Sequence, residues 1–375
     1  MDDKEQWLHK KLGDSRVSTI IMGQSPSSSA YNEEGVGIPF LQGCAEFGEV
    51  FPNTTVFSAD LLKIAPENSI LMSVRAPVGT INKADQKYVI GRGLCSIVPV
   101  IDGDFLYYYL LQNTHELELK AQGSTFLAIN SSELNEMPIS YPASLPAQRR
   151  IAAILSSADK VIASTQKVIA KYKQMKQGMM ENLLKPKEGW KMVRLGEVGE
   201  IITGLTYSPN NVCQEGVLVL RSSNIQDDNL CFEDNVYVDV ENYNPVIEND
   251  ILICVRNGSR ALIGKTARIT KEVEGCAFGA FMLVYRSSYN DFLYYFFKSD
   301  MFFSQVSRNI GATINSINGS DLKNMEVYMP SDFAKQRRIA SILSGIDSKI
   351  AAEEKVLEKY EKVKKGMMEK MLQKQ

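Results

Sequence analysis

One long segment of this sequence occurs twice, and that duplication constrains the fold more than any other feature. Residues 148–184 are QRRIAAILSSADKVIASTQKVIAKYKQMKQGMMENLL, and residues 336–372 are QRRIASILSGIDSKIAAEEKVLEKYEKVKKGMMEKML. The copies align without a gap at an offset of 188 residues, and 21 of the 37 positions are identical. Chance would give about two matches, so the copies arose by internal duplication.

Both copies are predicted to form long helices that pair with each other. They are rich in Lys, Arg, Ala, Leu, Ile and Met and contain no Pro, which favours helix. Apolar residues recur at about 3.5-residue steps, as in a coiled-coil seam. The residues assigned to that seam are Val161, Val168, Tyr172, Met175 and Met179 in the first copy and Val356, Tyr360, Val363 and Met367 in the second.

The direction and continuity of these helices can also be predicted. The chain runs along one helix, passes through a second globular segment and returns, so the pairing is expected to be antiparallel. Small residues at Ser156-Ser157 and Ser344-Gly345 predict a break in each helix. The alternative for each copy is an ordinary amphipathic helix packed on a globular core.

Composition excludes several classes of protein. With 375 residues, 44% hydrophobic and 23% charged, the chain is typical of a globular protein of two or three domains. No apolar run is long enough for a membrane span, and the N-terminal residues MDDKEQWLHKK lack the apolar core of a secretory signal. Six scattered cysteines without a CxxC motif, and only two histidines, argue against disulfides and metal sites. We therefore expect a cytoplasmic protein without membrane contact.

Charge is distributed unevenly along the chain. Residues 145–184 carry a net charge of +5 and residues 333–372 carry +4, which leaves −11 for the rest of a chain whose total is −2. The globular parts are therefore not expected to bind nucleic acid by charge alone. Any contact with DNA should depend on a few placed side chains or on a partner.

The remaining sequence divides into two globular segments that share an order of short motifs. We expect globular domains at residues 1–144 and 186–331 and helical segments at 145–185 and 332–375. DILICVRNG in the second domain corresponds to SILMSVRAP in the first, and DFLYYFFKS corresponds to DFLYYYLLQ. Strands are predicted at Ile38–Gln42, Ser69–Arg75, Tyr88–Gly91 and Leu94–Val98, and a helix at Asp104–Asn113.

The segments that resemble catalytic motifs do not support an enzyme. In NGSRALIGKT, residues 257–266, five residues separate the glycines where a phosphate-binding loop needs four, and β-branched residues follow instead of a helix. The acids form no convincing catalytic pair, and no cofactor motif is complete. The aromatic runs Phe105–Tyr109 and Phe292–Phe297 are weighed as base-stacking platforms and interpreted as buried helix faces.

Polar residues beside the duplicated strands are better candidates for contact with DNA. Arg, Asn and Gln are the side chains that recognise guanine and adenine edges through paired hydrogen bonds, and Thr in the GST and GAT turns suits phosphate. The candidate residues are Gln42, Arg75, Arg92, Thr125, Arg221, Ser222, Asn224, Arg256, Asn257, Lys265 and Thr313. Each also has an ordinary role as a turn or surface residue.

The complete pattern resembles the specificity subunit of type I restriction-modification enzymes. The resemblance rests on W…LG(D/E)…I…G at each domain start, a Pro-terminated strand at each domain end, and QRRIA-ILS--D--I leading into each long helix. It implies an α+β fold in which two mixed α/β target recognition domains join an antiparallel coiled coil with pseudo-two-fold symmetry.

The same resemblance implies a function without catalysis. Each domain would recognise one half of a split site in double-stranded DNA, and the helices would set the spacer and dock methyltransferase subunits, two of them. Those subunits and the restriction/translocase subunits would supply the chemistry, and this chain would bind no cofactor. The alternatives are the specificity chain of a bifunctional type II system, a fused methyltransferase, and a coiled-coil adaptor without a DNA role.

Overall fold

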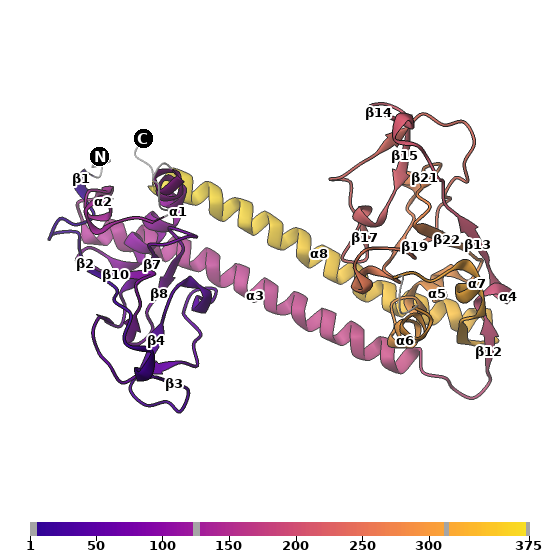
Figure 1. Cartoon of the computed structure of the whole chain (residues 1–375), viewed down its shortest axis with the longest axis horizontal. Coiled ribbons are helices and arrows are strands. Elements are labelled where there is room, and N and C mark those ends of the chain that lie inside the picture. The colour runs from indigo at the N-terminus through magenta and orange to yellow at the C-terminus, as the bar shows by residue number, and fades with distance from the viewer. Residues whose placement is uncertain (1–5, 123–127, 311–314, 373–375) are drawn as a thin grey trace. The chain divides into compact units, whose positions relative to one another are not determined.

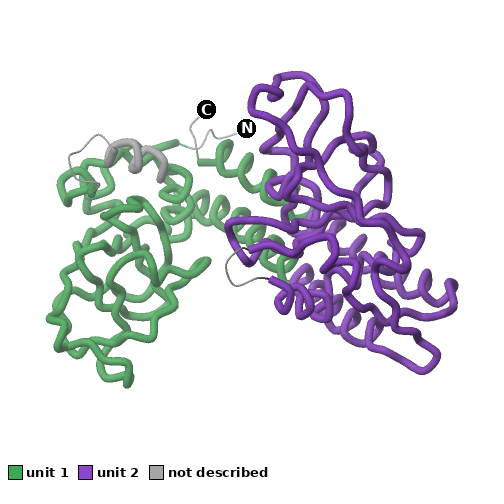
Figure 2. Tube along the Cα trace, turned by 45° about the vertical axis from the view of Figure 1, so that its right-hand side comes forward, with its two compact units in different colours: residues 1–167, 355–375 green, residues 168–354 purple. Residues whose placement is uncertain are grey.

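The computed structural model describes residues 6–122, 128–310 and 315–372. Two helices dominate it: α3 (Leu145–Leu183) and α8 (Phe333–Leu372) (Figure 1). The chain forms two compact units (Figure 2). Unit 1 comprises residues 1–167 and 355–375, and unit 2 comprises residues 168–354. Each unit thus combines one globular part with a portion of both helices.

In unit 1 the globular part contains a four-stranded and a five-stranded sheet besides the pair of β1 and β11. The sheet next to α3 is antiparallel and has the strand order β2-β10-β7-β8 (Figure 1). The second sheet has the order β3-β5-β4-β9-β6, and β4 and β9 in it are parallel. The elements are β1 (Trp7–Lys11), β2 (Ser18–Met22), β3 (Tyr31–Asn32), β4 (Ile38–Leu41), β5 (Phe57–Ser58), β6 (Ile64–Ala65), β7 (Ile70–Ser73), β8 (Ile81–Lys83), β9 (Tyr88–Ile90), β10 (Leu94–Pro99), α1 (Gly103–Gln122), α2 (Ser131–Asn135) and β11 (Pro138–Pro142).

Unit 2 repeats this plan. An antiparallel sheet has the order β13-β22-β19-β20, and a second sheet, β14-β18-β15-β21, contains the parallel pair β15 and β21. The elements are β12 (Trp190–Arg194), α4 (Leu195–Val198), β13 (Glu200–Thr203), β14 (Val212–Cys213), β15 (Val217–Leu220), β16 (Ile225–Gln226), β17 (Asn229–Leu230), β18 (Tyr237–Val238), β19 (Ile251–Cys254), β20 (Thr266–Arg268), β21 (Ala277–Phe278), β22 (Met282–Arg286), α5 (Asn290–Phe296), α6 (Asp300–Asn309), α7 (Gly319–Asn324) and β23 (Glu326–Pro330).

The first and last strands of each globular part pair with each other beside the long helix. β1 pairs with β11, and β12 pairs with β23. The helix that follows is fixed to this strand pair by a glutamine, because Gln148 Nε2 donates to the Pro142 carbonyl at 2.8 Å and Gln336 Nε2 to the Pro330 carbonyl at 2.6 Å. Both glutamines are buried. The glutamine of the QRRIA motif, in the first turn of each helix, therefore fixes that helix to its domain.

The aromatic runs are core, as the sequence predicted. Phe105 and Leu106 of α1 are fully buried in the unit 1 core, which also includes Leu155 of α3 and Met368 of α8. In unit 2, residues of α5 occupy the same place, in a core that includes Met180 of α3 and Leu343 of α8. Each hydrophobic core thus contains residues from both long helices as well as from its own domain.

The two helices pack against each other in antiparallel fashion, which confirms the coiled-coil prediction. In unit 1, Lys364 Nζ lies 2.5 Å from Asp159 Oδ1. In unit 2, Lys173 lies 2.8 Å from Glu354 and Lys176 lies 2.6 Å from Asp347. In successive pairs the residue number on α3 increases while the residue number on α8 decreases, as antiparallel pairing requires.

The seam assigned from the sequence is wrong at six of its nine positions, while Tyr172, Met179 and Met367 are half-buried. Val161, Val168 and Met175 are 36–42% exposed, as are Val356, Tyr360 and Val363. Ile162 and Ile169, each one residue after an assigned valine, are buried instead. Other buried positions of the helices include Leu155 and Thr165 in α3 and Leu343, Ile346 and Ile350 in α8. Both stripes recur with the heptad period, so spacing alone could not select the one that faces the partner helix.

The predicted helix breaks are also wrong, since α3 and α8 continue through both sites. Ser157 Oγ donates to the Ala153 carbonyl at 2.7 Å, and Ser344 Oγ to the Ser341 carbonyl at 3.1 Å. These hydroxyls therefore bond back to their own helix and do not cap a new one. Leu155 and Leu343 are fully buried next to these sites, so tertiary packing holds the helix through its small residues.

The corrected seam predicts a contrast between two adjacent residues. Ile169→Ala should lower the free energy of unfolding by about 2–4 kcal/mol, because it removes a buried side chain and leaves a cavity. Val168→Ala, at an exposed position, should change it by less than about 0.5 kcal/mol. Urea denaturation followed by circular dichroism measures both. Equal losses from the two substitutions would show that the seam has been assigned wrongly.

Candidate nucleic-acid interface

In unit 1, three predicted residues gather where the parallel strands end. Gln42 follows β4, and Arg92 lies in the turn after β9. A Cβ built on Gly93 would lie 2.9 Å from the Gln42 carbonyl oxygen, so the two turns lie against each other. The Val74 amide donates to the Gly93 carbonyl at 2.9 Å, which brings the next residue, Arg75, to the same place. All three side chains are exposed.

Unit 2 builds a corresponding group from different residues. Arg221 follows β15 as Gln42 follows β4, and Arg256 follows Val255 as Arg75 follows Val74. The Arg256 amide donates to the Phe281 carbonyl at 3.2 Å, and the Gly279 amide donates to the Leu220 carbonyl at 2.9 Å. The ends of β15, β19 and β21 therefore converge, and a polar group forms at the same point of each domain.

Arg256 is the most available of the unit 2 candidates. It is exposed, and its guanidinium lies 5.6 Å from the centre of the Phe281 ring. Phe281 is 57% exposed, and nothing in the sequence analysis selected it. Asn257 Nδ2 donates to Ser222 Oγ at 3.1 Å, which holds these two candidates beside each other. An arginine over an exposed aromatic ring can both bind a base edge and stack on a base.

Three other candidates in unit 2 form hydrogen bonds or ion pairs within their own domain. Asn224 is fully buried, and its side chain accepts from the Arg221 amide at 2.9 Å and donates to the Cys231 carbonyl at 3.0 Å. It is a turn residue and is not placed to reach a base. Arg221 is paired with Asp234 at 2.8 Å, and Lys265 Nζ donates to the Ile225 carbonyl. Both basic groups are committed to their own domain in this structure.

The two threonine candidates, Thr125 and Thr313, lie outside the described residues. Where the described residues resume, Ala128 pairs with Arg75 and Ser316 pairs with Arg256 in isolated β-bridges.

In each domain a glycine lies in close contact with the strand end that is next to the polar group. A Cβ at Gly23 would lie 2.1 Å from the Gly91 carbonyl oxygen, and a Cβ at Gly204 would lie 2.1 Å from the Gly279 carbonyl oxygen. Any larger residue would push these strand ends apart, so glycine is required at both contacts. Ser25 accepts from the Arg92 amide at 3.1 Å in unit 1. The glycines follow strands in matching positions of the two domains, a signal that aligning the halves would have revealed.

The other motifs have structural explanations. The segment resembling a phosphate-binding loop forms a short 3-10 turn at Arg260–Leu262 and then strand β20. Within residues 6–122, 128–310 and 315–372, no group of three or more His, Cys, Asp or Glu residues gathers as metal ligands. Over the same ranges, none of the helices combines the length and apolar character needed to cross a bilayer.

Comparison with known proteins gives a consistent family. The family model described as "Type I restriction modification DNA specificity domain" matches twice, at residues 4–174 and 187–362. The putative type I restriction enzyme MjaX specificity subunit of Methanocaldococcus jannaschii is 40% identical over 183 residues, which is 48% of this chain and 43% of that protein. The MjaVIII specificity subunit of the same organism is 25% identical over 301 residues, covering 73% of this chain and 70% of that protein.

A solved structure shares the fold. The S subunit of a type I restriction-modification system from M. genitalium has a TM-score of 0.64 at 17% sequence identity, covering 100% of this chain and 98% of that one. The two family matches account for both domains and most of both long helices. The chain therefore belongs to the family of type I restriction-modification DNA specificity domains.

Proposed function

We propose that this chain is the DNA-recognition subunit of a type I restriction-modification complex, with each unit recognising one half of a bipartite site. The observation that carries this proposal is the pair of polar groups at the parallel strand ends. They occupy matching places in the two domains and share one arginine, Arg75 or Arg256, but the side chains around it differ: Gln42 and Arg92 in unit 1, and Arg221 and Phe281 in unit 2. A constant framework with different side chains suits two half-sites of different sequence.

The same groups explain how an acidic protein can select DNA. The residues outside the two helical repeats carry a net charge of −11, so the chain has little general attraction for phosphates. Selection then depends on placed arginine and amide groups that make paired hydrogen bonds to bases. Chemistry is assigned to partner subunits, and this chain contributes sequence selection to modification and restriction alike.

The exposed stripes on the helices are proposed as the docking surfaces for modification subunits. In unit 1 they comprise Ile154 and Val161 of α3 and Val356 and Val363 of α8. In unit 2 the duplication places Ile342, Val168 and Met175 at equivalent positions, and Lys349 stands where unit 1 has Val161. Exposed apolar residues one heptad apart suit a partner helix. Ala152 and Asp159 of α3 face the domain of unit 1. Ile154 and Val161 lie on the opposite side of the same helix. One surface in each unit accounts for two modification subunits.

Arginine substitutions in the assembled complex test recognition. Arg75→Ala or Arg256→Ala should each reduce discrimination at one base pair by about 1–3 kcal/mol, because a bidentate contact to a base edge is lost. Arg16→Ala is the matched control. In the pairing of β2 with β10, Met22 lies beside Cys95 and Ser18 beside Pro99. Arg16 precedes Ser18, so it lies beyond the end of the sheet that is farther from Gly93. Binding to single-base variants of the methylated site, at fixed salt, measures the effect. A uniform loss would identify a phosphate contact, and unchanged binding for both variants would contradict the proposed interface.

Stoichiometry tests the docking surfaces. Val161→Asp with Val363→Asp should remove one modification subunit from the complex, and Val168→Asp with Met175→Asp should remove the other, because each pair places charge on one apolar surface. Ala153→Asp, also on an exposed position of α3, should leave both subunits bound. Native mass spectrometry of the copurified complex gives the count. Retention of two modification subunits by all variants would exclude the stripes as docking surfaces.

A further inference from the structure

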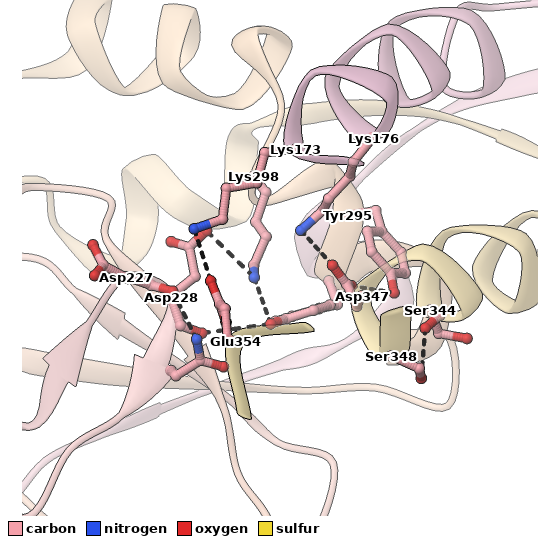
Figure 3. A network of polar contacts seen from close by, with 12 residues as sticks. Lys173, Lys176, Asp227, Asp228, Tyr295, Lys298, Ser344, Asp347, Ser348 and Glu354 are labelled. Atoms are coloured by element: carbon pink, nitrogen blue, oxygen red, sulfur yellow. Dashed lines mark hydrogen bonds and ion pairs between the residues drawn. The ribbon is translucent and has the colours of Figure 1, made fainter. Parts of the chain in front are cut away.

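Each unit contains one copy of a polar triad that joins its domain to both long helices. In unit 1, the Tyr108 hydroxyl donates to Asp159 Oδ2 at 2.6 Å, and Lys364 Nζ lies 2.5 Å from Asp159 Oδ1. In unit 2, the Tyr295 hydroxyl donates to Asp347 Oδ2 at 2.9 Å, and Lys176 Nζ lies 2.6 Å from Asp347 Oδ1. Figure 3 shows the second triad, with the lysine and the tyrosine meeting on one carboxylate.

The origin of the three side chains is the same in both copies. The tyrosine comes from a helix of the globular domain, α1 or α5. The aspartate comes from the long helix that follows that domain, and the lysine comes from the other long helix. Asp159 and Asp347 occupy equivalent positions of the duplicated segment, and so do Lys176 and Lys364. Each domain is therefore bonded to a carboxylate whose charge partner belongs to the opposite repeat.

The environment makes these contacts stronger than surface ion pairs. The side chains of Lys176 and Lys364 are 18% and 20% exposed, whereas Lys173, in the neighbouring pair with Glu354, is 59% exposed. Charge pairs withdrawn from water are less screened. Burial, followed by the nearby Asp159 carboxylate, raises the pKa of Tyr108 far above its usual range; burial and Asp347 do the same for Tyr295. Both phenols therefore stay protonated as donors.

A second set of contacts connects each triad to the four-stranded sheet of its domain, which contains β8 in unit 1 and β20 in unit 2. Lys83 of β8 pairs with Asp104 at 2.6 Å and lies 4.3 Å from the ring of Tyr107, next to Tyr108. Arg268 of β20 pairs with Asp291 at 3.4 Å and lies 4.5 Å from the ring of Tyr294, next to Tyr295. The cation, the acid and the tyrosine pair recur at matching places. The connection from sheet to helices is thus built twice from a cation, an aspartate and a pair of tyrosines, the cation being lysine in unit 1 and arginine in unit 2.

We infer that Tyr108–Asp159–Lys364 and Tyr295–Asp347–Lys176 are positioning residues that orient each recognition domain on the helix pair and thereby set the spacing between half-sites that the complex accepts. The inference rests on the proposed function of the chain as a DNA-recognition subunit. Helix length fixes how far apart two attachment points lie. The triads fix how each domain is held at its attachment point, and because each requires both helices, a shift of helix register disturbs them.

The test measures spacer selectivity in the assembled complex. The full chain is purified with its modification subunits, and methylation is followed on DNA with constant half-sites and a spacer varied by single base pairs. The double variant Tyr108→Phe with Tyr295→Phe keeps the rings and removes only the hydroxyls. The ratio of methylation at the preferred spacer to that at adjacent spacers should fall by about tenfold, as expected for loss of a hydrogen bond to a charged group. The bases preferred in each half-site should not change.

Substitutions of lysine separate positioning from stability. Lys176→Met with Lys364→Met should relax spacer selectivity in the same way, whereas Lys176→Arg with Lys364→Arg should retain it. The matched control is Lys173→Met, which removes an ion pair between the same helices without touching a tyrosine, and it should leave selectivity unchanged. If the tyrosine and methionine variants keep the spacer selectivity of the wild type, the inference is overturned, whether or not their melting temperatures are lower. Equal relaxation in Lys173→Met overturns it as well. A wild-type complex without preference for a bipartite site would instead contradict the proposed function.

Discussion

The half-buried ion pairs between α3 and α8 are the interactions on which the rest of this structure depends. Asp159 with Lys364 and Lys176 with Asp347 fix the antiparallel register of the helices within each unit. The buried leucines and isoleucines of the seam supply most of the free energy of packing, but apolar contacts tolerate a shift of one heptad. Partly buried charges do not, because a shift would leave them unpaired. The phenol of each domain then bonds to a carboxylate whose position is already set.

The duplication shows which parts of the chain are constant and which vary. The glutamine at the helix start, the tyrosine pair, the aspartate and the close glycine contact recur in both units. At the strand ends only one arginine recurs, as Arg75 and Arg256; Gln42 corresponds to Arg221, and Arg92 falls where unit 2 has Ala280. A protein built in this way can change the bases that it recognises while the attachment of each domain to the helices stays the same.

The sequence predicted the duplicated helices, the antiparallel pairing, the strands at residues 38–42, 69–75, 88–91 and 94–98, and the buried aromatic runs, because all depend on local pattern or repetition. It could not select between two adjacent heptad stripes, since both are apolar and only tertiary contacts distinguish Ile162 from Val161. Asn224 was grouped with the DNA candidates because its type suits base contact, yet its amide is used within a turn. Phe281 was missed because exposure of a single aromatic residue leaves no signal in spacing.

The most direct measurement of the central claim is the recognised sequence of a chimaera. Residues 7–142 are replaced by the corresponding segment of a family member with a different DNA site, and both long helices are kept. The methylated motif is then determined by single-molecule sequencing of DNA from cells that contain the complex. The account predicts that one half-site changes to that of the donor, while the other half-site and the spacer length are unchanged. A change in both half-sites, or in neither, would contradict the assignment of one half-site to each unit.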